Sequence, residues 1–179
     1  MLLILMRHGI AEELREGQTD AERALTADGK KKSRAALRGL RALLQNIDCM
    51  ATSPKMRALQ TAKIAAEVFE STEPEIWPEL ENAEYSALVE RFKTMDAPSV
   101  LLVGHEPGFS NLAARLLTGK ESGLRMEFKK SGVCVLDGDW STPKPRATLL
   151  WHLSPKQLRL IGKSQSAKFS HHSKTSAKR

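Results

Sequence analysis

The 179-residue chain has few cysteines, few aromatic residues and no long apolar segment. Its two cysteines, Cys49 and Cys134, each lack a second Cys nearby, so the spacings of zinc sites and redox motifs are absent and we expect no disulfide. Aromatic residues make up 5% of the sequence, which argues against a basic groove with interleaved aromatic side chains. No run approaches the roughly 20 apolar residues of a membrane span. Residues 1–6 are too short for the core of a signal peptide, so we expect a cytoplasmic protein.

The formal net charge of +7 is distributed unevenly along the chain. Residues 163–179 hold five Lys or Arg and no acid, so they account for +5 and leave +2 for the rest. This segment is rich in Ser, Lys and His, which is typical of a flexible tail. The preceding sequence has the composition of a soluble globular protein. We therefore expect one domain over residues 1–162, a basic tail over 163–179, and no role in binding nucleic acid.

Apolar runs alternate with segments of helical periodicity. Residues 2–7, 48–52, 75–77, 99–104, 133–136 and 147–153 are typical of strands. Helices are expected after a Thr26 cap, from a Ser53 cap with Pro54 in the first turn, over 85–95 and over 107–117. Such alternation predicts an α/β fold, a three-layer sandwich with a mostly parallel central sheet and helices on both faces. The last two strands are expected to pair as an antiparallel hairpin.

The first strand runs directly into Arg7-His8-Gly9. Five successive apolar residues need burial on both faces, as in a central strand, and the residues after such a strand reach the edge where ligands of open α/β folds bind. Gly9 allows the backbone to turn and approach a ligand closely. Two solvated polar residues at a strand end would give the same pattern, so residues 2–9 alone do not distinguish a catalytic site from a solvent-exposed strand end.

Two further segments follow strands in the same way: Ser53 to Ala62, which contains Arg57, and Gly104-His105. If these carboxyl ends converge, two arginines and two histidines share a pocket that needs no metal or cofactor. Arg7 and Arg57 can each hold phosphate oxygens with two hydrogen bonds. Like charge around His8 disfavours its protonated form and keeps it nucleophilic, while His105 can donate to a phosphoryl oxygen.

These motifs resemble the histidine phosphatase superfamily, also called phosphoglycerate mutase-like. Arg7-His8-Gly9, the segment from Ser53 to Ala62 and Gly104-His105 match its three motifs in order. Residues 6–11, 23–29 and 78–80 are most similar to its SixA group of protein phosphohistidine phosphatases. The resemblance implies a phosphoglycerate mutase-like fold and a metal-independent hydrolase that acts on phosphohistidine in a signalling protein. It implies that His8 is the nucleophile, that Arg7, Arg57 and His105 bind the phosphoryl group, and that Arg23 lies near phosphate or the substrate protein.

The general acid is the least determined part of the predicted site. Glu79 is the positional match in the resemblance, with Glu81 and Glu84 nearby, and it is equally compatible with a surface carboxylate. A phosphohistidine substrate reduces the need for an acid, because its P–N bond is labile once the imidazole is protonated. The short span from Glu79 to Ser99 leaves little chain for a lid, which favours a phosphorylated side chain on another protein.

Alternative interpretations remain open at this stage. The same fold could serve a small-molecule phosphomonoesterase or mutase, or a non-catalytic module that binds phosphoproteins. We expect a monomer that binds phosphate or another oxyanion in its pocket. Ser53 is interpreted as a helix cap or as a residue that orients the pocket, and His152, between Trp151 and Leu153, as a structural histidine.

Overall fold

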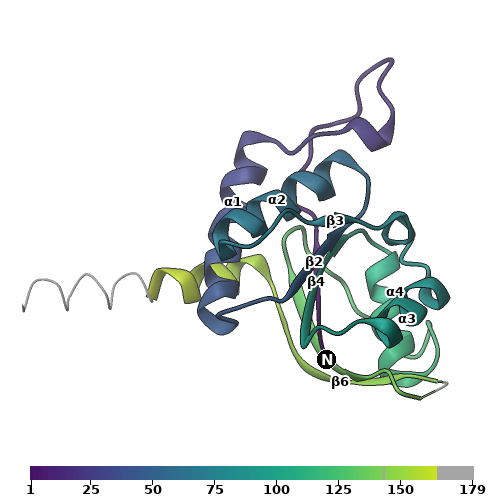
Figure 1. The fold of residues 1–179 in the computed structure, drawn as a ribbon. Coiled ribbons are helices and arrows are strands. Elements are labelled where there is room, and N and C mark those ends of the chain that lie inside the picture. Colours follow the sequence, from purple (N-terminus) through teal and green to yellow (C-terminus); the bar gives the residue numbers. More distant parts are fainter. Residues whose placement is uncertain (143, 165–179) are drawn as a thin grey trace, which may run out of the picture.

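The computed structural model describes residues 1–142 and 144–164, and within them a six-stranded sheet forms the centre, with strand order β3-β2-β4-β1-β5-β6 (Figure 1). The strands are β1 (Leu2–Arg7), β2 (Cys49–Thr52), β3 (Glu75–Ile76), β4 (Ser99–Gly104), β5 (Val133–Asp139) and β6 (Arg146–Leu153). The helices are α1 (Ala27–Leu43), α2 (Met56–Phe69), α3 (Tyr85–Thr94) and α4 (Gly108–Thr118), with 3-10 turns η1 (Asp20–Glu22) and η2 (Pro78–Glu81) and a last helical segment over 155–164.

The strand directions agree with the sequence-based fold. β1 pairs parallel to β4, β4 to β2, and β2 to β3. β5 pairs antiparallel to β1, and β5 with β6 forms the expected antiparallel hairpin. The sheet is therefore mostly parallel. Its central neighbours β2, β4 and β1 are the three strands that end in the predicted motifs, so their carboxyl ends lie side by side.

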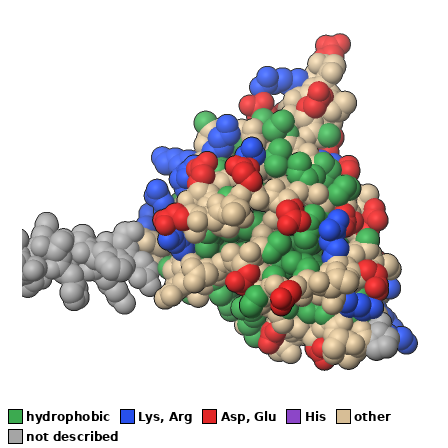
Figure 2. Space-filling model, in the orientation of Figure 1, with side chains coloured by type: hydrophobic (Ala, Val, Ile, Leu, Met, Phe, Trp, Pro, Cys, Tyr) green, Lys and Arg blue, Asp and Glu red, His purple; other side chains and the backbone are tan. Residues whose placement is uncertain are grey.

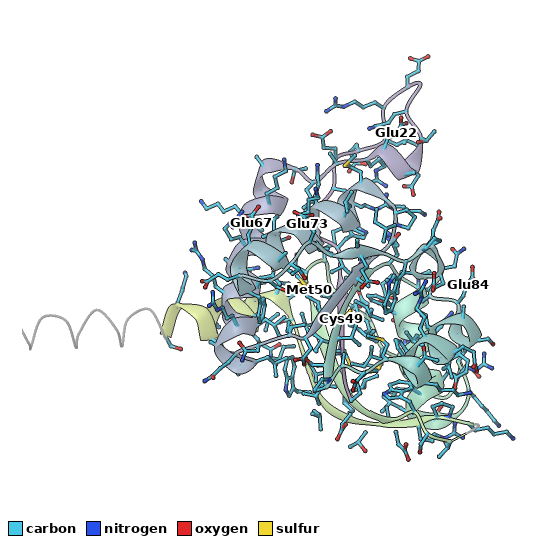
Figure 3. All side chains as sticks on the ribbon, in the orientation of Figure 1. Glu22, Cys49, Met50, Glu67, Glu73 and Glu84 are labelled. Carbon is cyan, nitrogen blue, oxygen red and sulfur yellow. The ribbon has the colours of Figure 1, made fainter. Side chains whose placement is uncertain are left out.

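Alternate residues of the central strands enter two separate cores, one on each face of the sheet. Ile4 and Met6 of β1 pack with α1, α2 and the segment 155–164. Leu3 and Leu5 pack with α3 and α4 on the other face. The same alternation places Met50 in the first core and Cys49 beside the second, at the start of β2 (Figure 3). The predicted three-layer sandwich is confirmed, and it follows from side chains that alternate across each strand.

The helical segment over 155–164 is absent from the sequence-based prediction. It begins with a capping box, because Ser154 Oγ accepts from the Gln157 N–H at 3.4 Å and Gln157 Oε1 accepts from the Ser154 N–H at 2.9 Å. It lies beside α1 (Figure 1), where a Cβ on Gly39 would stand 1.8 Å from the Leu158 carbonyl oxygen. The predicted boundary after residue 162 falls inside this helix, and residues 165–179 of the predicted tail lie outside the described residues.

The second helix begins later than predicted. Thr26 caps α1 as expected and accepts from the Gly29 N–H at 2.9 Å. By contrast, α2 begins at Met56 with Lys55 at the cap position, so the prediction that Ser53 caps this helix is wrong. The physical reason is that Ser53 still belongs to the sheet edge: its N–H donates to the Val103 carbonyl at 3.0 Å, and its hydroxyl contacts His105.

The segment between β1 and α1 folds back on itself. Ala11 and Leu25 form an antiparallel bridge, and the Glu12 N–H donates to the Ala24 carbonyl at 2.9 Å. The Thr19 N–H and hydroxyl both donate to the Glu22 carboxylate and hold the turn η1. The excursion projects from the body beyond α1 (Figure 1), and η1 at its return carries Asp20.

The surface over α1 and α2 mixes the two signs of charge. Lys and Arg side chains are interspersed there with Asp and Glu (Figure 2). Arg34 pairs with Glu67 and Arg41 with Glu70 across the two helices. No helix among the described residues combines the length and the apolar character needed to cross a membrane.

Candidate active site

The carboxyl ends of β1 and β4 bring two histidines together. Arg7 is paired with Gly104 in the sheet register, and the His8 N–H donates to the Gly104 carbonyl at 3.0 Å. The next residue on each strand is a histidine, and the ring centroids of His8 and His105 lie 5.1 Å apart. Each side chain belongs to a residue that is only 7% exposed. The convergence predicted from the strand ends is therefore present for this pair.

The contacts of His8 define where its proton lies. Nδ1 is 2.7 Å from the Gly9 carbonyl oxygen, which can only accept, so Nδ1 carries the hydrogen. The Arg57 Nε–H donates to His8 Nε2 at 3.2 Å, so Nε2 bears a lone pair. The neutral ring therefore presents an unprotonated Nε2 on the side of Arg57.

Burial keeps both rings neutral. Loss of hydration lowers the pKa of His8 from 6.5 to about 4. The hydrogen bond to Gly9 raises this pKa, whereas the positive charges of Arg57, Arg7 and Lys130 lower it further. Burial also lowers the pKa of His105 to about 3, with His8 and Arg57 acting in the same direction. Both imidazoles are thus uncharged at neutral pH, as a nitrogen nucleophile requires.

Arg7 is held from behind by the segment that precedes β5. Its Nη1 donates to the Phe128 carbonyl at 2.7 Å, while its Nε is buried and has no hydrogen-bond partner among the described residues. The Phe128 N–H in turn donates to Glu106 at 2.6 Å, and the Ser110 hydroxyl donates to the same carboxylate. This chain of contacts fixes the guanidinium, and its buried Nε–H needs an acceptor that the described residues do not supply.

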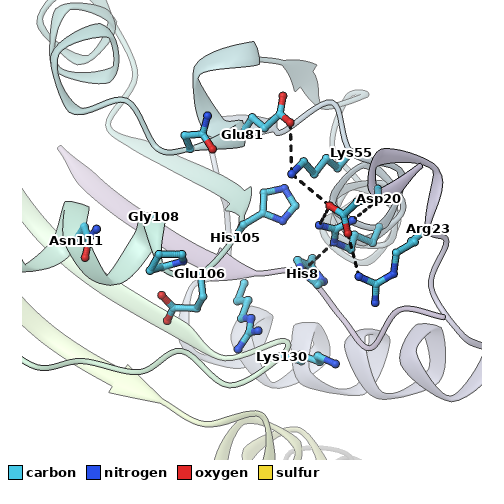
Figure 4. Close-up of a pocket in the computed structure, with 14 residues that line it drawn as sticks. His8, Asp20, Arg23, Lys55, Glu81, His105, Glu106, Gly108, Asn111 and Lys130 are labelled. Atoms are coloured by element: carbon cyan, nitrogen blue, oxygen red, sulfur yellow. Dashed lines mark hydrogen bonds and ion pairs between the residues drawn. The ribbon is translucent and has the colours of Figure 1, made fainter. Parts of the chain in front are cut away.

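Arg57 faces a carboxylate from the excursion between β1 and α1. Its Nη1 donates to the Asp20 carbonyl at 2.6 Å and its Nη2 to Asp20 Oδ2 at 2.9 Å (Figure 4). Arg23 pairs with the same carboxylate at 3.0 Å and Lys55 at 3.4 Å. The hydrogen bond from Arg57, then those from Arg23 and Lys55, hold the pKa of Asp20 well below its usual range despite some loss of hydration. Three cations therefore converge on one anionic group at the rim.

These residues line a single cavity of about 570 Å³. It brings together five of the predicted site residues: Arg7, His8, Arg23, Arg57 and His105. The remaining lining residues come from the rim excursion, the N-cap of α2, the turn η2 and the residue after it, the start of α4 with the residues before it, and the segment before β5: Asp20, Lys55, Glu81, Asn82, Glu106, Pro107, Gly108, Asn111 and Lys130 (Figure 4). Over the whole lining, five Lys or Arg side chains stand against three carboxylates, so the cavity favours an anionic ligand.

Comparison with known proteins gives the family. Residues 3–98, more than half of the chain, match the histidine phosphatase superfamily (branch 1). The chain belongs to this superfamily. The phosphohistidine phosphatase SixA of Escherichia coli strain K12 is 27% identical over 165 residues, which span 89% of this chain and 98% of the relative. A solved structure of the protein histidine phosphatase SixA complexed with tungstate superimposes with a TM-score of 0.76 at 28% identity, covering 88% of this chain and 99% of the other.

A solved structure of lower sequence identity shares the architecture. A mycobacterial glucosyl-3-phosphoglycerate phosphatase, solved with inorganic phosphate, has a TM-score of 0.69 at 17% identity and covers 87% of this chain and 98% of the other. At this identity the likeness shows the fold alone. Together with the SixA relatives, it confirms the predicted phosphoglycerate mutase-like sandwich. The family match and the SixA relatives support a phosphatase of this superfamily.

The structure does not bring the candidate acid Glu79 into the cavity of this histidine phosphatase homologue. Its carboxylate pairs with Arg91, whose guanidinium also lies 4.6 Å from the centre of the Trp77 ring. Although partial burial opposes it, the hydrogen bond from Arg91 lowers the pKa of Glu79. Glu81, at the other end of η2, lines the cavity instead and pairs with Lys55 at 3.3 Å. The short 3-10 turn directs the two carboxylates to different surroundings.

Sequence reasoning missed several lining residues of the superfamily site. Lys55 stands inside the second motif, between Ser53 and Arg57, so its position in that motif was an available signal. Asp20 lies in a polar segment with no periodicity, and only the excursion folded over the cavity reveals it. Lys130 precedes β5 and likewise carries no motif. Among the described residues, no group of three or more His, Cys, Asp or Glu is placed to hold a metal ion.

Proposed function

We propose that the chain is a phosphohistidine phosphatase, which removes the phosphoryl group from a histidine-phosphorylated signalling protein through a covalent phospho-His8 intermediate. The observation that carries the proposal is the neutral His8 ring, whose Nδ1–H is bound to Gly9 and whose Nε2 holds a lone pair beside Arg57. A nucleophile in this form needs no general base. The resemblance to SixA phosphatases supports the choice of substrate.

The phosphoryl group would bind between the two arginines. Arg7 offers its unpartnered Nε, and Arg57 offers the N–H groups that Asp20 now occupies. A dianionic phosphoryl group competes for Arg57 because it carries more charge than one carboxylate. Arg23 and Lys55, which also contact Asp20, add positive charge at the rim. Oxyanion binding is consistent with the tungstate found in the SixA relative.

The reaction would proceed in two displacements at phosphorus. Nε2 of His8 attacks the phosphorus atom while the P–N bond to the substrate imidazole breaks, and that imidazole leaves as a neutral ring with a proton it has taken from solvent. Water then attacks the phosphorus of phospho-His8, the second P–N bond breaks, and inorganic phosphate and free His8 result. Catalysis of this kind depends on positioning and on charge stabilisation, which the two arginines and His105 would supply.

The absence of Glu79 from the cavity supports a labile substrate. When the P–O bond of a phosphoserine or sugar phosphate breaks, the serine or sugar oxygen leaves as an alkoxide and needs a firm proton donor, whereas the imidazole that leaves from phosphohistidine does not. Glu79 is occupied by Arg91, and Glu81 is paired with Lys55. We therefore assign no side chain as general acid.

The test is dephosphorylation of a histidine-phosphorylated protein by the full chain and by the variant His8→Ala. The wild type should release phosphate and carry an acid-labile label after brief exposure to labelled substrate. His8→Ala should show neither, while His152→Asn, which changes a histidine outside the cavity, should retain both. Normal turnover by His8→Ala would exclude the covalent route.

A substrate panel distinguishes the alternatives. Preferential hydrolysis of sugar or nucleotide phosphates would identify a small-molecule phosphomonoesterase and contradict the assignment of phosphohistidine. Tight binding of the phosphoprotein without phosphate release would instead identify a binding module and contradict catalysis.

A further inference from the structure

The hydroxyl of Ser53 lies against His105 at the end of β2. Ser53 is fully buried, and its Oγ is 2.8 Å from His105 Nε2. The Lys55 N–H donates to the same Oγ at 3.3 Å. No other hydrogen bond of this hydroxyl occurs among the described residues. Its single proton therefore has one acceptor within reach, which is Nε2 of His105.

This contact determines the form of the His105 ring. If the Ser53 hydroxyl donates to Nε2, then Nε2 bears the lone pair and the neutral ring carries its hydrogen on Nδ1. The reverse arrangement, with Nε2–H donating to Oγ, would leave two buried groups without a partner, the hydroxyl proton and the Nδ1 lone pair, whereas the Nδ1–H form leaves one; each costs about 1–3 kcal/mol. Burial of His105 disfavours the doubly protonated ring.

The other ring nitrogen of His105 has no partner. Nδ1 is buried, and no described residue accepts a hydrogen bond from it. His105 lines the cavity beside His8 (Figure 4). A buried N–H with no acceptor is costly, and a phosphoryl oxygen bound in the cavity is the acceptor that would satisfy it.

We propose that Ser53 is a positioning residue, which fixes His105 in the Nδ1–H form so that this N–H donates to an oxygen of the bound phosphoryl group. The proposal rests on the proposed function of the same cavity, and it extends that function by assigning the proton of the second histidine. Without the hydroxyl, His105 can place its hydrogen on Nε2 and turn a lone pair of Nδ1 toward the anion. That arrangement repels the oxygen which His105 should bind.

The direct test is the ¹⁵N NMR signature of the His105 ring in the full chain at neutral pH. In the wild type we expect a protonated, pyrrole-like Nδ1 and an unprotonated, pyridine-like Nε2, and addition of inorganic phosphate should shift the Nδ1 signal. In Ser53→Ala the hydrogen should redistribute toward Nε2. A wild-type ring with its hydrogen on Nε2 would overturn the proposal, and this measurement needs no variant to fold.

Binding and kinetics give a second readout. Ser53→Ala should bind inorganic phosphate roughly tenfold or more weakly, as expected for a lost hydrogen bond to a charged group, and should lower kcat more than it raises KM. Ser99→Ala removes a buried strand hydroxyl at the opposite end of β4, where it binds Asp48, and should leave the His105 signals unchanged. Unaltered phosphate affinity in a folded Ser53→Ala would refute the role of Ser53. Because phosphate and NMR require no phosphoprotein, failure here is separable from failure of the proposed substrate.

Discussion

Two buried neutral histidines should make the stability of the folded chain depend on pH between 7 and 5. Burial lowers the pKa of His8 to about 4 and that of His105 to about 3. In the unfolded chain each imidazole takes up a proton near its ordinary pKa of 6.5, whereas both stay neutral in the folded chain at pH 5. The unfolded state then binds more protons, so the free energy of unfolding falls as the pH drops below 6.5.

The magnitude follows from the pKa of the unfolded state. At pH 5 each imidazole is 1.5 pH units below 6.5, which corresponds to about 2 kcal/mol of lost stability for each histidine. The value does not depend on the exact folded pKa, provided that this stays well below 5. The pair should therefore cost about 4 kcal/mol, a large share of the 5–15 kcal/mol that is typical of folded domains. Carboxylates with lowered pKa, such as Asp20 and Glu79, lose their stabilising effect mainly below this range.

The assay is urea unfolding at pH 7, 6 and 5 in a buffer without phosphate, since a bound oxyanion would stabilise the folded state. His8→Asn and His105→Asn should each remove about 2 kcal/mol of the pH dependence. The double variant should keep only the smaller dependence from His152, whose pKa burial also lowers. A pH dependence that persists unchanged in the double variant would refute the assignment of neutral, buried rings.

Two further predictions concern the rim and the helical segment 155–164. Asp20→Asn removes the negative charge that Arg57 contacts at 2.9 Å, so inorganic phosphate should inhibit this variant several-fold more strongly than the wild type. Asp28→Asn, on the exposed start of α1, should leave the inhibition by phosphate unchanged. Weaker inhibition of Asp20→Asn would contradict competition between Asp20 and phosphate for Arg57. Gly39→Ala would place a methyl group 1.8 Å from the Leu158 carbonyl oxygen, so thermal unfolding should show that the free energy of unfolding falls by about 1–3 kcal/mol or more. The variant Arg38→Ala, at the neighbouring exposed position, should unfold like the wild type. An unchanged Tm for Gly39→Ala would mean that the helical segment does not pack on α1.

The strands and the residues that follow them could be predicted because their signal is local. A run such as Ser99–Gly104 is apolar on both faces, and every residue of it is buried in the structure. Once such a run is identified as a central strand, topology alone brings its next residue, His105, to the edge where β1 also ends. Arg57 follows from the same logic, because it lies in the first turn of α2, shortly after β2 ends. The sequence therefore sufficed to name residues that converge, since convergence depends on strand order and not on side-chain detail.

Residues outside such runs could not be placed in this way. Whether Glu79 or Glu81 faces the cavity depends on the direction of η2, which Arg91 on a different element helps to decide. The segment 155–164 has few buried apolar residues, and its position depends on the missing side chain of Gly39. The start of the segment 155–164 does carry a local signal, the capping box of Ser154 and Gln157. Its placement against α1 and the direction of η2 are instead set by contacts between residues distant in sequence.

The protonation of the two histidines also depends on contacts that the strand pattern does not predict. Both follow parallel strands, and the contacts assign a hydrogen on Nδ1 to His8, with the same form proposed for His105. The acceptor for His8 Nδ1 is the neighbouring Gly9, so Nε2 keeps a lone pair, to which Arg57 donates and which attack on phosphorus would use. The partner of His105 is Ser53, 52 residues earlier, and it occupies Nε2 instead. One ring can therefore offer a lone pair to phosphorus while the other offers an N–H to oxygen. The difference between nucleophile and donor depends on whether the nitrogen that meets the phosphoryl group carries a lone pair or a hydrogen.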